Sequence, residues 1–501
     1  MNRWLGLLLA AVSLDAAVIR GSVVNHDGGE ALSRAEVTLR GVAGSGGSTR
    51  TARTDSFGMF AFSSVPAGAY LVSASRQYSV SAFYGQKRWN SAGLPVVVEA
   101  NDSLTLSIRM HRFGAIAGRV LDENDVGILG HEVVAYRDEK PAQVVARATT
   151  DDYGRYRIYG LTPGTYLVRS AAKTVEGVGY LPVFAPSSQE MDQARRVDVQ
   201  LDQESTGIDL RPAQGRLFEV TGRVSGGAPV ELTLAGETGR QTIAVTGAFR
   251  FNPVAPGQYE LYGTAPSPAN CRVSGLAAAH MNFAVDRDIA GLAVVLRCVQ
   301  PTYVSYYTPA SGTTRSPGGA SLQARRVDLA GIGDTVNLGN GPEAAVLAPG
   351  RWELLLQPPA GYAVTGFSQS GPPFSSGSRP DGWLAFTAGD NGRLEFSLSN
   401  KSASLRGVVR GIDREAVMGA PVYLEAYDPR SKTRIGELRT VYTSSRGAYE
   451  CSGLAPGEYR VLATFDYVAP DTATMELSGA KTVSVWGSDP QTLDLDLFLL
   501  P

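Results

Sequence analysis

Few residues in this sequence have the types and spacing that catalysis or metal binding needs. None of the histidines belongs to an HExxH or HxxE pattern able to hold zinc on one helix face. They lie in different parts of the chain: His26, His111, His131 and His280. Glu132 follows His131, but we expect a strand there, and neighbouring strand side chains point to opposite faces. We therefore expect no metal and no cofactor.

Nucleophiles and paired acids give no better case for an enzyme. The stretch Gly366 to Ser370 comes nearest to a G-x-S-x-G elbow but lacks the closing glycine. Asp151 and Asp152 could be calcium ligands or glycosidase carboxylates. A similar acid, Asp55, recurs in the same frame, which favours a turn residue that accepts hydrogen bonds from backbone amides. The prediction is that the chain is not an enzyme.

Two groups of aromatic side chains could instead bind carbohydrate, because sugars stack their apolar ring faces on exposed aromatic rings. One group lies among amide and basic side chains: Phe83, Tyr84 and Trp89. The other is a run of tyrosines: Tyr303, Tyr306 and Tyr307. We interpret both groups as ligand-binding residues. The alternative is that these rings cover sandwich ends or junctions between modules.

Composition indicates a folded, all-β protein, and the N-terminal residues indicate export. Charged residues make up 19% and the formal net charge is -2, so nothing points to a nucleic-acid partner. The 57 glycines and 28 prolines suit many short strands joined by tight turns. Residues 1–17 read as a cleaved signal peptide, with Arg3 before an apolar run that is too short to cross about 30 Å of hydrocarbon. We expect a secreted or periplasmic protein with no membrane span in the mature chain.

A repeat organises the chain. Counting from a glycine, apolar residues follow at the second, fourth and seventh positions, a glycine at the tenth and an aromatic residue at the twelfth. Four copies share this register, beginning at Gly58, Gly154, Gly247 and Gly447. The pattern predicts a strand, a turn and a second strand whose first aromatic ring fills the core.

An apolar-x-Gly-x-Val strand precedes each copy, and its glycine suggests close approach of another backbone. These glycines are Gly21, Gly118, Gly222 and Gly407. The last interval is nearly twice the earlier ones, so one degenerate module is hidden there, with its turn at Leu347 to Trp352. We expect five modules after the signal peptide: 18–112, 113–214, 215–299, 300–400 and 401–501 (modules 1 to 5).

The repeat resembles the carboxypeptidase regulatory-like domain, a transthyretin-like sandwich grouped with carbohydrate-binding-like folds. The resemblance rests on the first-strand signature, a second strand such as Ala35 to Leu39, and the core from Asp151 to Tyr166. It implies a tandem array of small antiparallel Ig-like β-sandwiches, as found in secreted bacterial proteins. The family takes its name from an accessory domain, so the resemblance implies no catalytic residues.

The cysteines fit this module plan. Cys451 occupies a core position of the repeat, so we expect a buried free thiol. Cys271 and Cys298 both fall in module 3, near the ends of expected strands, and an exported protein could join them in a disulfide.

The sequence therefore predicts a non-catalytic binding or adhesion protein whose partner is a polysaccharide or a cell-envelope protein. Two alternatives stay open: a structural spacer or envelope scaffold with no ligand of its own, and an accessory protein to a secreted hydrolase.

Overall fold

The computed structural model describes most of the chain. The described ranges are 17–42, 49–138, 143–225, 229–237, 239–266, 270–308, 312–314, 319–340, 344–359, 362–369, 383–389, 392–399, 403–428, 433–485 and 490–500. The expected signal peptide lies outside them except for Ala17. Regular structure in these ranges is almost entirely strand, which confirms the all-β prediction. The helical elements found there are η1 (Met191–Gln193) and α1 (Thr472–Leu477).

The described residues contain five large hydrophobic cores, one within each expected module, and each lies between two sheets. In module 1, one sheet is β4 (Met59–Val65), β1 (Ala17–Asn25) and β8 (Ser103–Met110). The other is β3 (Arg50–Arg53), β2 (Glu36–Gly41), β5 (Gly68–Ser75) and β6 (Ala82–Phe83), with β7 (Val96–Val98) also on β5.

Modules 2 and 3 repeat this plan. Module 2 contains β12 (Arg155–Leu161), β9 (Gly114–Arg119) and β17 (Glu204–Ser205), facing β11 (Gln143–Thr149), β10 (Glu132–Arg137), β13 (Gly164–Ser170) and β16 (Val197–Val199), plus the hairpin β14 (Lys173–Val175) and β15 (Val178–Tyr180). Module 3 contains β21 (Ala248–Arg250), β18 (Val220–Ser225) and β24 (Ile289–Val295), facing β20 (Gly239–Val245), β19 (Val230–Gly236), β22 (Gly257–Pro266), β23 (Leu276–Val285) and β25 (Arg297–Cys298).

Modules 4 and 5 follow it as well. Module 4 contains β27 (Gly312–Thr314), β26 (Thr302–Thr308), β34 (Arg393–Ser399) and β32 (Ala363–Gln369), with β30 (Ala344–Ala345) on β26, facing β29 (Gly331–Gly339), β28 (Ser321–Asp328), β31 (Gly350–Gln357) and β33 (Leu384–Ala388). Module 5 contains β38 (Ala448–Leu454), β35 (Ala403–Arg410), β41 (Gln491–Thr492) and β42 (Leu495–Asp496), facing β37 (Thr433–Tyr442), β36 (Pro421–Asp428), β39 (Gly457–Ala463) and β40 (Lys481–Val485).

One pairing in each module departs from the expected antiparallel order. The first strand lies parallel to the closing strand of the same module, as in β1 with β8 and β9 with β17. The same holds in the other three modules. A parallel pair needs a long crossover connection, and here the whole module separates the two strands.

In modules 1, 2, 3 and 5 the glycine of the first strand is required by close packing, as its pattern predicts. A Cβ added there would collide with a carbonyl oxygen of the closing strand or the segment beside it, those of Leu106, Ile208, Leu292 and Leu493. On the antiparallel side, the first aromatic residue of the repeat lies directly opposite: Phe60, Tyr156, Phe249 and Tyr449. Each glycine thus makes room for a neighbouring backbone and an aromatic ring.

The aromatic residue at the third position of β5, β13, β22, β31 and β39 makes an equivalent hydrogen bond in every module. In four modules its phenol donates to the carbonyl four residues earlier, at 2.8–2.9 Å: Tyr70 to Pro66, Tyr166 to Thr162, Tyr259 to Ala255 and Tyr459 to Ala455. In module 4 the indole N–H of Trp352 donates to Ala348 at 2.8 Å. The degenerate module therefore keeps the contact with a different side chain.

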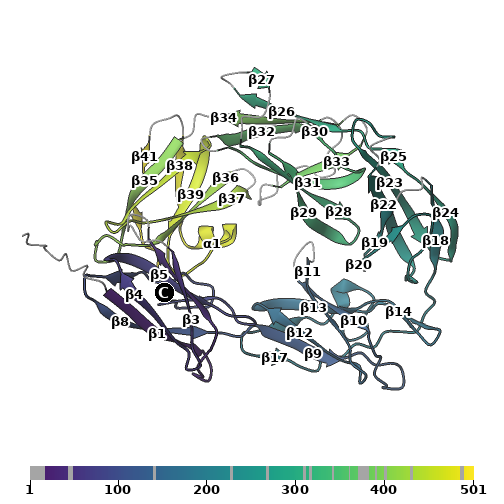
Figure 1. The fold of residues 1–501 in the computed structure, drawn as a ribbon, viewed down its shortest axis with the longest axis horizontal. Coiled ribbons are helices and arrows are strands. Elements are labelled where there is room, and N and C mark those ends of the chain that lie inside the picture. Colours follow the sequence, from purple (N-terminus) through teal and green to yellow (C-terminus); the bar gives the residue numbers. More distant parts are fainter. Residues whose placement is uncertain are drawn as a thin grey trace, which may run out of the picture.

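The modules follow one another around a ring, and module 5 lies against module 1 (Figure 1). Val42, Ala69 and Leu71 of module 1 are buried beside Met418 and Tyr442 of module 5. Modules 3 and 4 are joined by buried charges, because Glu260 of β22 contacts Arg326 of β28 at 3.1 Å. The array is therefore closed rather than extended.

Candidate ligand-binding surfaces

The outer face of β26 in module 4 presents two tyrosines. Tyr303 is 55% exposed and Tyr307 is 40% exposed, whereas Val304 and Tyr306 between them are buried in the core. Residues four apart on a strand share a face and lie about 13 Å apart. The two rings therefore stand in one row on an open sheet face.

Polar residues occupy the neighbouring strand beside this row. Arg393 of β34 lies opposite Tyr303, Glu395 lies opposite Ser305, and Ser397 lies opposite Tyr307. Ser368 of β32, an exposed residue, extends the polar row by pairing with Glu395. The face thus combines two rings with hydrogen-bonding side chains, which is the pairing that sugar binding needs.

The expectation for Tyr306 is wrong. Its side chain is 1% exposed, belongs to the core of module 4 and stacks on Phe396 with ring centroids 6.1 Å apart. Tyr306 and Tyr307 are adjacent on a strand, so only one of them can face outward. Burial also raises the pKa of the Tyr306 phenol to about 12. Its ring cannot contact a ligand on the sheet surface.

The second aromatic group lies where module 1 meets module 5. Tyr84 packs against the core of module 1, and the chain beside Trp89 contacts module 5, since Val468 donates to the carbonyl of Asn90 at 2.9 Å. The amide of Gln86 is occupied locally: it accepts from the Phe83 N–H at 2.8 Å and donates to the Trp89 carbonyl at 2.6 Å. These contacts favour the alternative that the segment covers a junction. Ligand binding by Phe83, Tyr84 and Trp89 stays a prediction.

The acidic side chains of the turns accept hydrogen bonds from backbone N–H groups. The Asp55 carboxylate accepts from the N–H groups of Phe57 and Met59 at 2.8 and 2.9 Å, and Asp151 does the same for Tyr153 and Arg155. This confirms the turn interpretation of both residues. Among the described residues, no cluster of three histidine, cysteine or acidic side chains is placed to hold a metal ion.

The histidine next to an acid is a core residue. His131 is fully buried, and one of its ring nitrogens lies 2.8 Å from the carbonyl of Ala171. Burial lowers the pKa of His131 to about 4, which keeps the ring neutral near pH 7. These contacts make His131 part of the packing of module 2.

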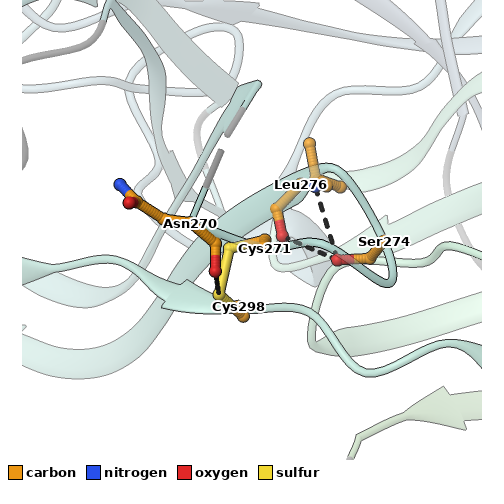
Figure 2. The surroundings of a disulfide bond; sticks show 5 residues. All are labelled: Asn270, Cys271, Ser274, Leu276 and Cys298. Carbon is orange, nitrogen blue, oxygen red and sulfur yellow. Dashed lines mark hydrogen bonds between the residues drawn. A yellow bond between two sulfur atoms is a disulfide. The ribbon is translucent and has the colours of Figure 1, made fainter. Parts of the chain in front are cut away.

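The cysteines lie as the module plan requires. Cys451 is a buried free thiol in the core of module 5, where burial raises its pKa. In module 3 the sulfur atoms of Cys271 and Cys298 are 2.12 Å apart and the Cα atoms 5.2 Å apart. Figure 2 shows this bond beside a turn in which the Ser274 hydroxyl donates to the Leu276 carbonyl at 3.1 Å.

Comparison with protein families identifies the first two sandwiches. The model of the carboxypeptidase regulatory-like domain matches residues 18–111 and 115–202. Modules 1 and 2 are similar to this domain along these residues. Both modules carry the parallel first and closing strands, the occluded glycine and the tyrosine hydrogen bond, and modules 3 and 5 share these features.

Solved structures with some similarity include two pilins and the TIE protein of Bacillus anthracis. A minor pilin of Streptococcus agalactiae is 14% identical, with 40% of this chain and 97% of that chain covered and a TM-score of 0.24. The shaft pilin SpaA of Lactobacillus rhamnosus GG is 10% identical, with 40% and 98% covered and a TM-score of 0.26. The TIE protein of Bacillus anthracis is 12% identical, with 96% and 73% covered and a TM-score of 0.19. At these scores the likeness carries no conclusion about function.

A comparison with curated proteins gives no match. In the described part of the chain, no helix has the length and apolar character needed to cross a membrane.

Proposed function

We propose that this chain is an exported, non-catalytic polysaccharide-binding protein that presents its ligand-binding face on a closed ring of β-sandwiches. The observation that carries the proposal is the outward row of Tyr303 and Tyr307 beside polar residues of β34. Two rings on a flat face suit an extended sugar chain, which offers repeated apolar ring faces at intervals along its length.

The closure of the ring favours this proposal over a spacer. A spacer separates two attachment points, so its end modules have to lie far apart. Here module 1 and module 5 share a buried apolar cluster and backbone hydrogen bonds. A compact arrangement of this kind holds several surfaces in fixed relative positions, which suits a binding protein.

Affinity electrophoresis of the mature chain through gels containing different polysaccharides tests the proposal. The wild-type chain should be retarded by at least one polysaccharide. If each ring contributes about 1 kcal/mol, Tyr303→Ala/Tyr307→Ala should bind roughly thirtyfold more weakly. The thermal midpoint should stay nearly unchanged, because both side chains are exposed.

The double variant Phe57→Ala/Tyr153→Ala is a matched control. It also removes two exposed rings, which are 77% and 60% exposed on turns of modules 1 and 2, but not on one sheet face. This control should be retarded like the wild type. Equal loss in both double variants, or no retardation of the wild type by any polysaccharide tested, would rule out the proposed face.

A further inference from the structure

A cavity of about 350 Å³ lies at the junction of modules 1 and 2. Module 1 contributes Tyr78 from the loop between β5 and β6, and the connection to module 2 contributes Arg112 and Phe113. Module 2 contributes Arg157, Tyr159 and Gly160, all on β12. This volume falls within the range of sites for small molecules.

Two exposed tyrosines from different modules form the apolar wall of this junction cavity. Tyr78 is 60% exposed and Tyr159 is 54% exposed, although their rings meet edge to face with centroids 5.6 Å apart. Gly160 leaves the site open beside them, because a Cβ added there would meet no atom within 4 Å. Much of both ring surfaces is therefore available to a ligand.

The backbone holds Tyr78 in an unfavourable conformation. Its φ of 64° lies in the left-handed region, which residues with a Cβ rarely adopt. Two backbone hydrogen bonds tie this loop to the connection between the modules. The Val80 N–H donates to the His111 carbonyl at 2.9 Å, and the Phe113 N–H donates to the Tyr78 carbonyl at 3.4 Å. Strained residues held in this way cluster at ligand-binding sites.

The arginines supply a position for an anionic group. Arg157 donates from Nε to Glu204 at 2.7 Å, and its guanidinium carbon lies 6.0 Å from the Tyr159 ring centroid. Within the described residues, the two terminal nitrogens of Arg157 have no hydrogen-bond partner. The Arg112 guanidinium makes one long contact, 3.5 Å from Nη2 to a carboxylate oxygen of Glu30, while the Arg112 backbone N–H donates to Asp202 at 2.7 Å. A free guanidinium edge matches the two oxygens of a carboxylate.

We propose that the junction cavity binds a carboxylated sugar residue, with the sugar ring against Tyr78 and Tyr159 and the carboxylate on Arg157. The inference takes its ligand class from the proposed function but concerns a separate site, far along the chain from Tyr303 and Tyr307.

Titration calorimetry of the full mature chain with two probes of the same size tests this proposal. The probes are methyl β-glucuronide and methyl β-glucoside, which differ in the carboxylate. The glucuronide should bind to one site per chain, and the glucoside should bind at least tenfold more weakly. Arg157→Gln should remove the preference, and Tyr78→Ala/Tyr159→Ala should remove binding of both probes.

Arg216→Gln is the matched control. Arg216 also pairs with a carboxylate, Asp288 at 2.8 Å, and lies 5.2 Å from an aromatic ring, that of Phe218, but it does not line the junction cavity. Arg216→Gln should bind the glucuronide as tightly as the wild type does. The double variant Tyr303→Ala/Tyr307→Ala should also bind the glucuronide as tightly as the wild type.

Three results would overturn the inference: no glucuronide binding by the wild-type chain, equal binding of both probes, or equal losses in the Arg157 and Arg216 variants. None of them bears on polysaccharide retardation through the module 4 face. Conversely, Tyr303→Ala/Tyr307→Ala can lose polysaccharide retardation and still bind the glucuronide. That result would support the junction cavity as a separate site.

Discussion

The backbone N–H of Ala92 in module 1 donates to the carbonyl of Phe465 in module 5 at 2.8 Å. The return bond from Val468 to Asn90 flanks it, and the ammonium of Lys87 lies 3.7 Å from the buried carboxylate of Asp466. These contacts join the first and last sandwiches of the chain. Because they involve backbone groups on both sides, the two modules meet in a defined register.

The occluded glycine of the first strand in modules 1, 2, 3 and 5 should be intolerant of a methyl group. In module 3 we expect Gly222→Ala to destabilise by about 2 to 4 kcal/mol, since its Cβ would overlap the Leu292 carbonyl and the Phe249 ring. Chemical unfolding followed by circular dichroism measures this. Gly247→Ala, in the same module, should stay near the wild type because no atom lies within 4 Å of the added carbon. Similar losses in both variants would contradict the packing argument.

Module 2 should fold by itself. A chain covering residues 113–214 has its own core, so it should show a β-type circular dichroism spectrum and a cooperative transition. In this fragment Tyr166→Phe should lower the unfolding free energy by about 1 kcal/mol, because the Thr162 carbonyl loses its hydrogen bond. A fragment without a cooperative transition would argue against independent modules.

The bond between Cys271 and Cys298 should stabilise module 3. It closes a loop with a sequence separation of 27, so the chain-entropy estimate is about 3 to 4 kcal/mol. In differential scanning calorimetry, a reducing agent should lower the transition of module 3 in the wild type and have no effect on Cys271→Ser/Cys298→Ser. Peptide mapping that finds both thiols free in protein from an oxidising compartment would disprove the bond.

Acid should weaken the contact between modules 3 and 4. Burial alone would raise the pKa of Glu260, but hydrogen bonds from His280 and Arg326 outweigh it and hold the pKa below its ordinary value. Stabilisation by this carboxylate is therefore complete above the ordinary glutamate pKa and is lost as the pH falls through the lowered one.

Hydrogen exchange of β22 and β28 at decreasing pH measures this weakening. The protection factors of Glu260→Gln should be low already at neutral pH and should change little further in acid. The exposed pair of Glu219 with Arg250 is the control, and Glu219→Gln should leave the pH response of the wild type intact. An interface equally protected at pH 7 and pH 3 would contradict the role of Glu260.

Local patterns predicted the sandwich because each depends on neighbouring residues. The turn acid Asp151 and the core aromatic Tyr166 are set by strand alternation and turn chemistry, and both lie where the repeat places them. Trp352 identified module 4 for the same reason. Which face of β26 points to the core is harder to predict from the sequence, because Tyr303, Tyr306 and Tyr307 place rings on both faces of this strand. Only the burial of Tyr306 in the structure decides it.

No local sequence pattern predicted the contacts between modules. Leu71 continues a run of apolar residues that reads as core, yet its side chain lies in the cluster shared with module 5 and not in the core of its own sandwich. Tyr159 did carry a signal, since the equivalent outward position holds Ser63, Asn252 and Ser452 in the other copies. Its partner Tyr78 lies outside the repeat, so the junction cavity requires the structure.

Small-angle X-ray scattering of the mature chain tests the closed ring most directly. The wild type should give a pair-distance distribution that ends near the width of the ring. Leu71→Arg, which places a charge in the apolar contact with Met418 and Tyr442, should lengthen the distribution, whereas Val126→Arg, at an exposed position in the loop between β9 and β10 of module 2, should not. A wild-type distribution as long as five sandwiches in a row would contradict the closed ring and favour the spacer.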